Sequence, residues 1–439
     1  MYLITKMNFN KLSLFNFALA AFPLSFIAGN MIININILFI TFLAILFFKK
    51  QLFQLKYFFL DKLIFLYFSL ILITALINDF YFFSEKMAWM GYFSTVIKSI
   101  FLLRYLLLYI VLRFLIEKNI ISLKFFFISC SFSVFFVSFD IFLQFLNGKD
   151  IFGFVGQGRK LAGPFGDELI AGGFIQRFSL FAFFLLPLFF YHKISKKFYK
   201  FIIPVFFVIF FIGLIIAGNR MPTLIFLFTI FLVIIFQKQT RKFLIPFLII
   251  FSFIFTIIFK SNETIRINFT DLYGKVSQMS IFILNKDFFN KDSPQYLKEF
   301  SSFYDTWLMN KYIGGGIKNF RYYCHERPNI KKESKFICNM HPHNYYLEIL
   351  TETGIFGFFI VLCIFLNTLH LTFIKKYFYN SVLSENNIII PFIFLFIGEI
   401  FPLKSTGSFF TTGNATYIFL ILGIMIGLVR RENPIENKI

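Results

Sequence analysis

The chain has 439 residues, of which 58% are hydrophobic and only 15% charged, and its mean hydropathy is +0.76. Phe alone accounts for 76 residues, more than one water-soluble core can bury at this length, so apolar surface must face lipid along many segments. This composition excludes an ordinary cytosolic enzyme. The net charge of +21 does not indicate nucleic acid as a partner, because Lys and Arg cluster in short runs between apolar stretches, as in cytoplasmic loops.

Apolar runs long enough to cross a bilayer recur along the whole chain. These runs do not alternate as barrel strands do, and lipid cannot satisfy unpaired backbone groups, so we expect helices. The chain is therefore predicted to be an all-α, polytopic membrane helix bundle. About twelve transmembrane spans are expected, at 12–29, 31–48, 63–79, 95–115, 123–146, 172–191, 201–217, 222–237, 243–259, 354–373, 388–402 and 415–430.

The orientation of the chain in the membrane follows from its basic residues. They concentrate in the short segments on the side of the membrane where the N-terminus lies. We expect both termini in the cytoplasm, with 431–439 as a cytoplasmic tail and the first span as an anchor rather than a removed signal peptide. The region 1–146 is expected to hold N-terminal transmembrane helices, followed by a membrane domain at 147–430. Two segments face outward, 147–171 and the longer 260–345, so chemistry is expected on the outer face.

The first outward segment carries Arg159 and Lys160 together with turn residues and a carboxylate pair, a pattern that a purely structural turn explains equally well. Farther along, Gly218-Asn219-Arg220 breaks the chain between two spans at the outer side. Arg220 there can extend to lipid phosphates, the common outcome, or bind a pyrophosphate with its forked guanidinium.

The large outward loop offers further cations and a glycine run. Arg266 follows a span directly, and Trp307, Gly314-Gly315-Gly316 and Arg321 could approach a phosphate or a sugar. Packing explains these residues equally well.

The cysteines and histidines of this loop allow two interpretations. Cys324 and Cys338, on an oxidising outer side, favour a disulfide that closes the loop. The alternative is a zinc site, whose ligands would come from Cys324, His325, Cys338, His341 and His343. The other two cysteines, Cys130 and Cys363, lie in spans and are expected to be packing residues.

The strongest local signal is His341-Pro-His343-Asn344, followed by Glu348, at the junction of the loop with the next span. A neutral imidazole accepts a proton near neutral pH, so His343 is the candidate base, and Asn344 or Glu348 could fix its tautomer. The alternative is that both histidines are only loop and capping residues.

Charged residues lie within the spans, where a charge at mid-bilayer costs at least about 2.5 kcal/mol on insertion scales. Among them, Arg104, Asp140, Arg177 and Glu399 need partners or water. Arg–carboxylate pairs are the favoured role, and an ion or proton path, as in a secondary transporter, is the alternative. No nucleotide-binding, metal-sugar or hydrolase motif is present, so hydrolysis of a cytosolic nucleotide is not expected, and the donor is expected to carry its own leaving group.

The His341-Pro-His343-Asn344-x-x-Leu347…Glu352-x-Gly354-x-x-Gly357 run resembles the signature of the O-antigen ligase and O-antigen polymerase superfamily. The Gly218-x-Arg220 break, Lys160-x-x-Gly163-x-Phe165 and Gly314-x-Gly316-x-x-Phe320 recur in that family's order, and the resemblance spans roughly 150–430. It implies a glycosyltransferase of the GT-C type in the bacterial inner membrane, with its active face in the periplasm.

The resemblance also implies a reaction and its residues. Such enzymes move a glycan from undecaprenyl diphosphate, without metal or other cofactor, to a hydroxyl of a lipid A-core sugar in ligases. Polymerases use another lipid-linked glycan as acceptor, and protein O-oligosaccharyltransferases use a protein. His343 matches the catalytic base and Arg220 the essential arginine, while Arg266, or its rival Arg321, matches a second diphosphate-binding arginine. Lys160 or Arg159 stands where the family has an Arg. We expect the ligase reaction, with inversion at the anomeric carbon.

Overall fold

The computed structural model describes residues 9–81, 94–156, 160–190, 196–237, 241, 244–284, 295–327, 338, 342–378, 388–405 and 407–431. Within these ranges the chain is almost entirely helical, with one isolated bridge between Lys149 and Val155. The helices are α1 (Phe9–Ala28), α2 (Asn30–Phe53), α3 (Phe59–Tyr81), α4 (Ser94–Glu117), α5 (Leu123–Asn147), α6 (Ala171–Phe189), α7 (Lys196–Ile216), α8 (Arg220–Phe236), α9 (Leu244–Ser261), α10 (Glu263–Leu284), α11 (Gln295–Met309), α12 (Phe320–Tyr323), α13 (Tyr345–Leu369), α14 (Ile390–Glu399) and α15 (Thr412–Arg430).

Nine helices in the described part of the chain are long and apolar enough to cross a membrane, and three shorter apolar helices, α7, α8 and α14, accompany them. Each expected span corresponds to one of these helices, so the prediction of an all-α polytopic membrane protein is confirmed. Aromatic side chains interlock the bundle: Phe181 of α6 meets Phe127 of α5 at 5.1 Å and Phe392 of α14 at 4.9 Å between ring centroids. Much of the Phe content thus fills the interior between helices.

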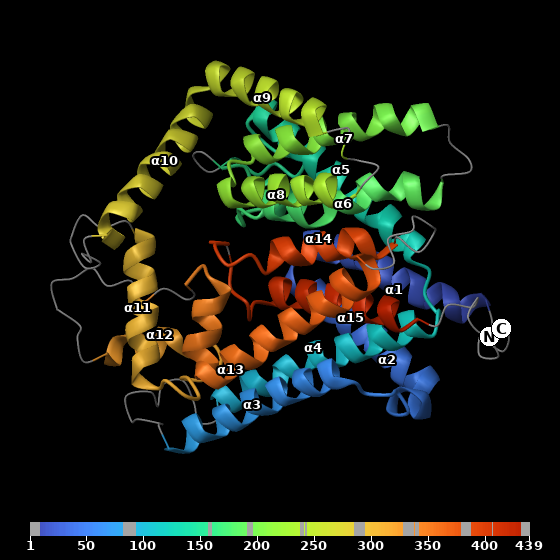
Figure 1. Ribbon diagram of the computed structural model, residues 1–439, viewed down its shortest axis with the longest axis vertical. Helices are drawn as coiled ribbons and strands as arrows, with labels where there is room; N and C mark the ends of the chain where they lie inside the picture. Colours follow the sequence, from blue (N-terminus) through green and yellow to red (C-terminus); the bar gives the residue numbers. More distant parts are fainter. Residues whose placement is uncertain are drawn as a thin grey trace.

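Helices α10, α11 and α12 lie together at one end of the bundle, on the left in Figure 1. They occupy part of the region expected as a large loop, which is therefore largely helical where it is described. A small second core forms there from Phe303 of α11, Phe320 of α12 and Cys324. The α13 helix begins at this same end, close to the end of α14 and the start of α15.

Helix α13 begins at Tyr345, earlier than the expected start at 354, because the Asn344 side chain caps it. The Asn344 Oδ1 accepts hydrogen bonds from the backbone N–H groups of Tyr346 and Leu347, at 3.0 and 3.1 Å. This cap satisfies two of the donors that a helix N-terminus leaves unpaired. The cap therefore fixes the direction in which the chain leaves His343.

The same helix is broken at Gly354, whose φ of 67° is left-handed. In an unbroken helix the Ile355 N–H would bond to the Thr351 carbonyl. Here the Ile355 N–H donates to the Lys311 carbonyl at 2.9 Å, and the Thr351 carbonyl accepts from the Gly315 N–H at 2.9 Å. The glycine-rich segment thus satisfies the backbone groups that the break releases.

From the sequence, either packing or ligand binding could explain these glycines. The contact with α13 explains them by packing. A Cβ on Gly314 would lie 2.5 Å from the Thr353 nitrogen, and one on Gly354 would lie 2.2 Å from the Tyr312 carbonyl oxygen. The glycines let the backbone of the large loop approach the broken helix. The close backbone approach predicted for Gly314–Gly316 is therefore to α13.

Replacing Gly354 with Ala is expected to lower the free energy of unfolding by about 2 kcal/mol or more, because a left-handed conformation and a backbone clash act together. Gly274→Ala is the matched control, since Gly274 lies inside α10 with nothing within 4 Å of an added Cβ. The control should leave stability unchanged or slightly raise it. Thermal unfolding of the two variants in the same detergent measures the difference, and equal midpoints would contradict this interpretation of the break.

Candidate functional site

His343 lies directly before the cap of α13 in a left-handed backbone conformation, with φ of 54°. A non-glycine residue rarely adopts this conformation, and strained backbones of this kind cluster at functional sites. The side chain is half-buried. Burial lowers the pKa of the His343 imidazole from its ordinary value, and the positive charge of Lys160 lowers it further. The imidazole is therefore neutral near pH 7 and able to accept a proton.

This pKa shift predicts how activity depends on pH. Because the pKa of His343 lies below the ordinary value of about 6.5, kcat should fall on acidification only below about pH 6.5. Replacing Lys160 with Met removes a positive charge and should raise that pKa, so the acidic limb of the kcat profile should move to higher pH. Lys149→Met, an exposed cation of the same loop, is the control and should leave the limb in place. An unmoved limb in the Lys160 variant would refute the coupling.

Arg220 is the first residue of α8 and is held by its neighbours rather than by lipid alone. The preceding Asn219 accepts a hydrogen bond from the Gly172 N–H at 3.0 Å and donates one to the Leu169 carbonyl at 3.1 Å. The Arg220 side chain is 14% exposed and lies 3.6 Å from the Asp271 carboxylate of α10. The guanidinium thus has an acidic partner on the helix that follows α9.

The loop after α5 connects the Arg220 region with His343. The Leu161 N–H donates to the Ala217 carbonyl, three residues before Arg220, at 3.3 Å. Lys160, next in the chain, is the cation whose charge acts on the His343 imidazole. Lys160, Arg220 and His343, predicted from three separate segments, therefore belong to one end of the bundle.

The remaining predicted cations either have a different ionic partner or lie wholly or partly outside the described residues. Arg266 is 49% exposed and lies 3.4 Å from Glu263, one turn earlier on α10. Arg321 belongs to α12, but its side chain is outside the described part of the structure, and Arg159 and His341 are outside it altogether. Arg266 lies on the same helix as Asp271, the partner of Arg220, and its role as the second diphosphate cation stays a prediction.

Asn344 and Glu348 were expected to fix the tautomer of His343, and the structure gives them other partners. The Asn344 Nδ2 donates to the Pro402 carbonyl at 2.9 Å, in addition to the cap that its Oδ1 forms. The Glu348 carboxylate accepts from the Ser408 hydroxyl and, at 2.5 Å, from the Phe409 N–H. Both side chains thus tie α13 to the segment between α14 and α15.

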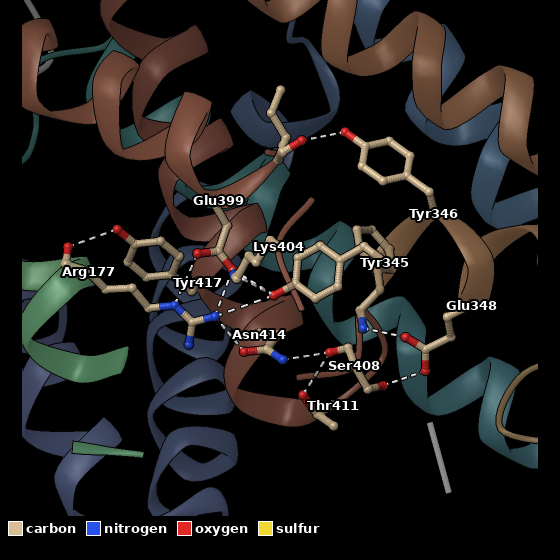
Figure 2. Close-up of polar contacts among 12 residues, drawn as sticks. Arg177, Tyr345, Tyr346, Glu348, Glu399, Lys404, Ser408, Thr411, Asn414 and Tyr417 are labelled. Atoms are coloured by element: carbon tan, nitrogen blue, oxygen red, sulfur yellow. Dashed lines mark hydrogen bonds and ion pairs between the residues drawn. The ribbon is translucent and has the colours of Figure 1, made fainter. Parts of the chain in front are cut away.

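A buried ionic network lies beside these contacts (Figure 2). The Glu399 carboxylate, at the end of α14, lies 2.6 Å from the Arg177 guanidinium of α6 and 2.5 Å from the Lys404 ammonium. Tyr345, the first residue of α13, donates its hydroxyl hydrogen to Glu399 at 2.6 Å, and Asn414 of α15 accepts from Arg177 at 2.5 Å. Residues of α6, α13 and α14 therefore meet at the Glu399 carboxylate, and α15 joins the network through Arg177.

Two cations share this one carboxylate, so the network carries a net positive charge. Burial lowers the pKa of Lys404 to about 8, although Glu399 opposes the shift. Lys404 is therefore still protonated at neutral pH. The sequence favoured an Arg–carboxylate pair as the role of Arg177 and of Glu399, without naming the partner of either. It did not indicate Tyr345, Lys404 or Asn414, whose only signal was their position beside spans.

Asp140 and Arg104 do not form the expected Arg–carboxylate pairs within the described part of the chain. Asp140 accepts the Ile151 N–H at 2.8 Å and so fixes the loop after α5. Arg104 donates to the Phe101 carbonyl and to the Tyr105 hydroxyl, at 2.5 and 2.6 Å. These partners satisfy Asp140 and Arg104 only in part, because within the described residues the Asp140 Oδ2 and the Arg104 Nε are buried without a hydrogen-bond partner.

Cys324 and Cys338 are joined by a disulfide, with their Cα atoms 5.6 Å apart. Arg327 donates to the Cys324 carbonyl at 2.8 Å and to the Ser302 carbonyl of α11 at 3.2 Å. Cys338 lies five residues before His343, and the disulfide attaches the chain at this point to the small core at α11 and α12. Its sulfurs cannot serve as the thiolate ligands of the alternative zinc site, and the described residues contain no group of three His, Cys, Asp or Glu suited to a metal.

Comparison with known proteins gives one family. No curated protein matches the chain. The family model described as O-antigen ligase matches residues 205–362, from α7 to the second half of α13, and so includes Arg220, the disulfide and His343. The match, over just over a third of the chain, supports the resemblance drawn from the sequence to the O-antigen ligase and O-antigen polymerase superfamily. Together with the apolar helices it suggests a multi-pass membrane protein of a glycosyltransferase-like kind.

Proposed function

We propose that the chain is an O-antigen ligase-type glycosyltransferase that moves a glycan from undecaprenyl diphosphate to a hydroxyl of a lipid A-core sugar. The observation that carries the proposal is the position of His343 within the matched family region, with a lowered pKa and next to the loop that holds the Arg220 segment. The proposal places the protein in the bacterial inner membrane, with both termini in the cytoplasm and the site in the periplasm.

In this reaction His343 removes the proton of the acceptor hydroxyl while that oxygen attacks the anomeric carbon. The glycosyl–phosphate bond breaks on the opposite face, so the configuration inverts and undecaprenyl diphosphate leaves. Arg220, at the positive end of the α8 dipole, compensates the charge that develops on the diphosphate. Lys160 adds a second positive charge on the same side as His343. These side chains supply the base and the charge compensation without a metal.

The polar residues of the spans give little support to the transporter alternative. Arg177 and Glu399 bind each other and Tyr345, while Asp140 and Arg104 bind local backbone. A transport path requires polar groups that can exchange partners with a solute or proton. The described partners of Arg177 and Glu399 instead join three helices, and those of Arg104 and Asp140 lie within the same helix or the loop that follows it.

The test is product formation by the purified chain in lipid nanodiscs, with a defined undecaprenyl-diphosphate glycan as donor. With lipid A-core added, we expect the glycan on the core and release of undecaprenyl diphosphate. A lengthened lipid-linked glycan formed without lipid A-core would instead identify a polymerase, and glycan on a protein acceptor would identify a protein oligosaccharyltransferase. No transfer to any of the three acceptors, with solute flux in proteoliposomes, would refute the glycosyltransferase proposal.

A further inference from the structure

The polar side chains of the cap and first turn of α13 bind residues of the segment 399–409, which leads from α14 to α15. Asn344 donates to Pro402, the Tyr346 hydroxyl donates to the Ile400 carbonyl, and Glu348 accepts from Ser408 and Phe409. Tyr345 completes the set through Glu399 and Lys404, as Figure 2 shows. Four side chains within five residues of His343 therefore depend on this segment for their partners.

The ionic network fixes that segment in turn. Arg177 binds Glu399 with both Nε and Nη2, at 3.2 and 2.6 Å, and Lys404 donates to the Tyr345 hydroxyl at 3.1 Å. Asn414 links Arg177 to the Ser408 carbonyl, which it reaches at 2.6 Å. Glu399, Lys404 and Tyr345 are each at least nine-tenths buried. A buried, fully bonded network of this kind admits few alternative arrangements.

From these contacts we infer that Tyr345 and Glu399 are positioning residues for His343, a role that rests on the proposed function. His343 does not hold its own left-handed backbone conformation, which persists only where the surroundings impose it. The cap at Asn344 and the anchor at Tyr345, the next two residues, impose it. Glu399 acts through Tyr345, and Arg177 and Lys404 act through Glu399.

Positioning matters because a general base must lie within hydrogen-bond reach of the proton that it takes. A displacement of about 1 Å can lower the rate about 10²-fold while the substrate is still bound. Loss of the Tyr345 anchor should therefore lower kcat and leave the KM for the lipid-linked donor nearly unchanged. A merely structural role would instead lower the amount of folded protein and leave the kcat of the folded fraction intact.

The bundle contains a matched control at its other buried ion pair. Tyr109 of α4 donates to Asp61 of α3 at 2.5 Å, and Arg113 lies 2.5 Å from the same carboxylate. This trio repeats the Tyr–carboxylate–Arg arrangement of Tyr345, Glu399 and Arg177, and Tyr109 and Asp61 are equally buried. None of the contacts described for this trio involves α13 or the described residues of 399–409.

The experiment compares Tyr345→Phe with Tyr109→Phe, because each removes one buried hydroxyl and keeps the ring. Steady-state kinetics with the undecaprenyl-diphosphate glycan should show kcat lowered about 10- to 100-fold in Tyr345→Phe, with donor KM within about twofold of wild type. Tyr109→Phe should keep kcat within about twofold. Thermal unfolding in detergent and gel filtration report how much of each variant is folded.

Equal kcat for Tyr345→Phe and wild type, or equal losses in both variants, would overturn the inference. If Tyr345→Phe does not fold, Tyr346→Phe takes its place in the comparison. This variant removes the neighbouring hydrogen bond to the Ile400 carbonyl, and a loss of kcat is expected. His343→Ala separates this inference from the proposed function. An inactive His343→Ala with a fully active Tyr345→Phe refutes only the positioning role, whereas a wild-type chain that transfers no glycan refutes the function itself.

Discussion

His343→Ala is expected to lower glycan transfer about 10²- to 10⁴-fold, the range that a positioned general base contributes. The imidazole is neutral at pH 7 because burial and Lys160 lower its pKa, so its loss removes the proton acceptor from the acceptor hydroxyl. The donor should still bind, since the charges proposed to hold the diphosphate are unchanged. Transfer of glycan from undecaprenyl diphosphate to lipid A-core by purified protein, followed as kcat and donor KM, measures the effect.

His325→Ala is the matched control for this variant. His325 is an exposed histidine of the same region, next to the disulfide, and no role in the reaction is proposed for it. The control should keep kcat within about twofold of wild type. Near-normal transfer by His343→Ala, in protein that unfolds at the wild-type temperature, would show that another group takes the proton.

The membrane architecture could be predicted from the sequence because hydropathy is a local property. Each apolar run is long enough to cross the bilayer or nearly so, and helices satisfy their own backbone groups within the run. The helices of the expected large loop were not predicted. Helix α11 is amphipathic and depends on the small core at Phe303, Phe320 and Cys324, which the chain forms only once it has folded.

The start of α13 shows the same limit at the level of one residue. Hydropathy placed the span at 354 because the preceding turns contain polar and ionisable residues such as Glu348 and Glu352. Those two carboxylates are buried at 1% exposure, and Glu348 binds Ser408 and Phe409, sixty residues away. Burial against a distant loop permits a helix where local hydropathy does not indicate one.

Residues of the candidate site could be proposed from the sequence where they belong to a local motif. Residues that reach the site only through long-range contacts could not. The histidine run pointed to His343, and that role stays a prediction. The run gave no indication that residues 399–409 would hold the turn that follows it, because Glu399 and Lys404 meet Tyr345 only in the folded chain. The role of Arg266 likewise stays a prediction, and its described ionic partner is Glu263 on its own helix.

The second large effect is expected at Arg220. Arg220→Ala should lower kcat about 10²- to 10³-fold, because the leaving diphosphate then develops charge without its preorganised partner. Arg220→Lys keeps the charge but loses the forked pair of donors, so an intermediate loss of about tenfold is expected. Arg241→Ala is the control, since Arg241 is an exposed arginine just beyond the opposite end of α8. The same donor-to-core assay measures all three.

Asp271 and Arg266 sharpen the Arg220 prediction. In the structure the Asp271 carboxylate lies where an anion can bind Arg220, and it is 46% exposed. If the diphosphate replaces that carboxylate, Asp271→Asn should lower the donor KM, by up to about fivefold for an exposed pair worth up to about 1 kcal/mol. An unchanged KM would indicate that the donor reaches Arg220 from another side.

Arg266→Ala should have little effect on kcat. A loss of kcat as large as that of Arg220→Ala would instead place Arg266 at the diphosphate.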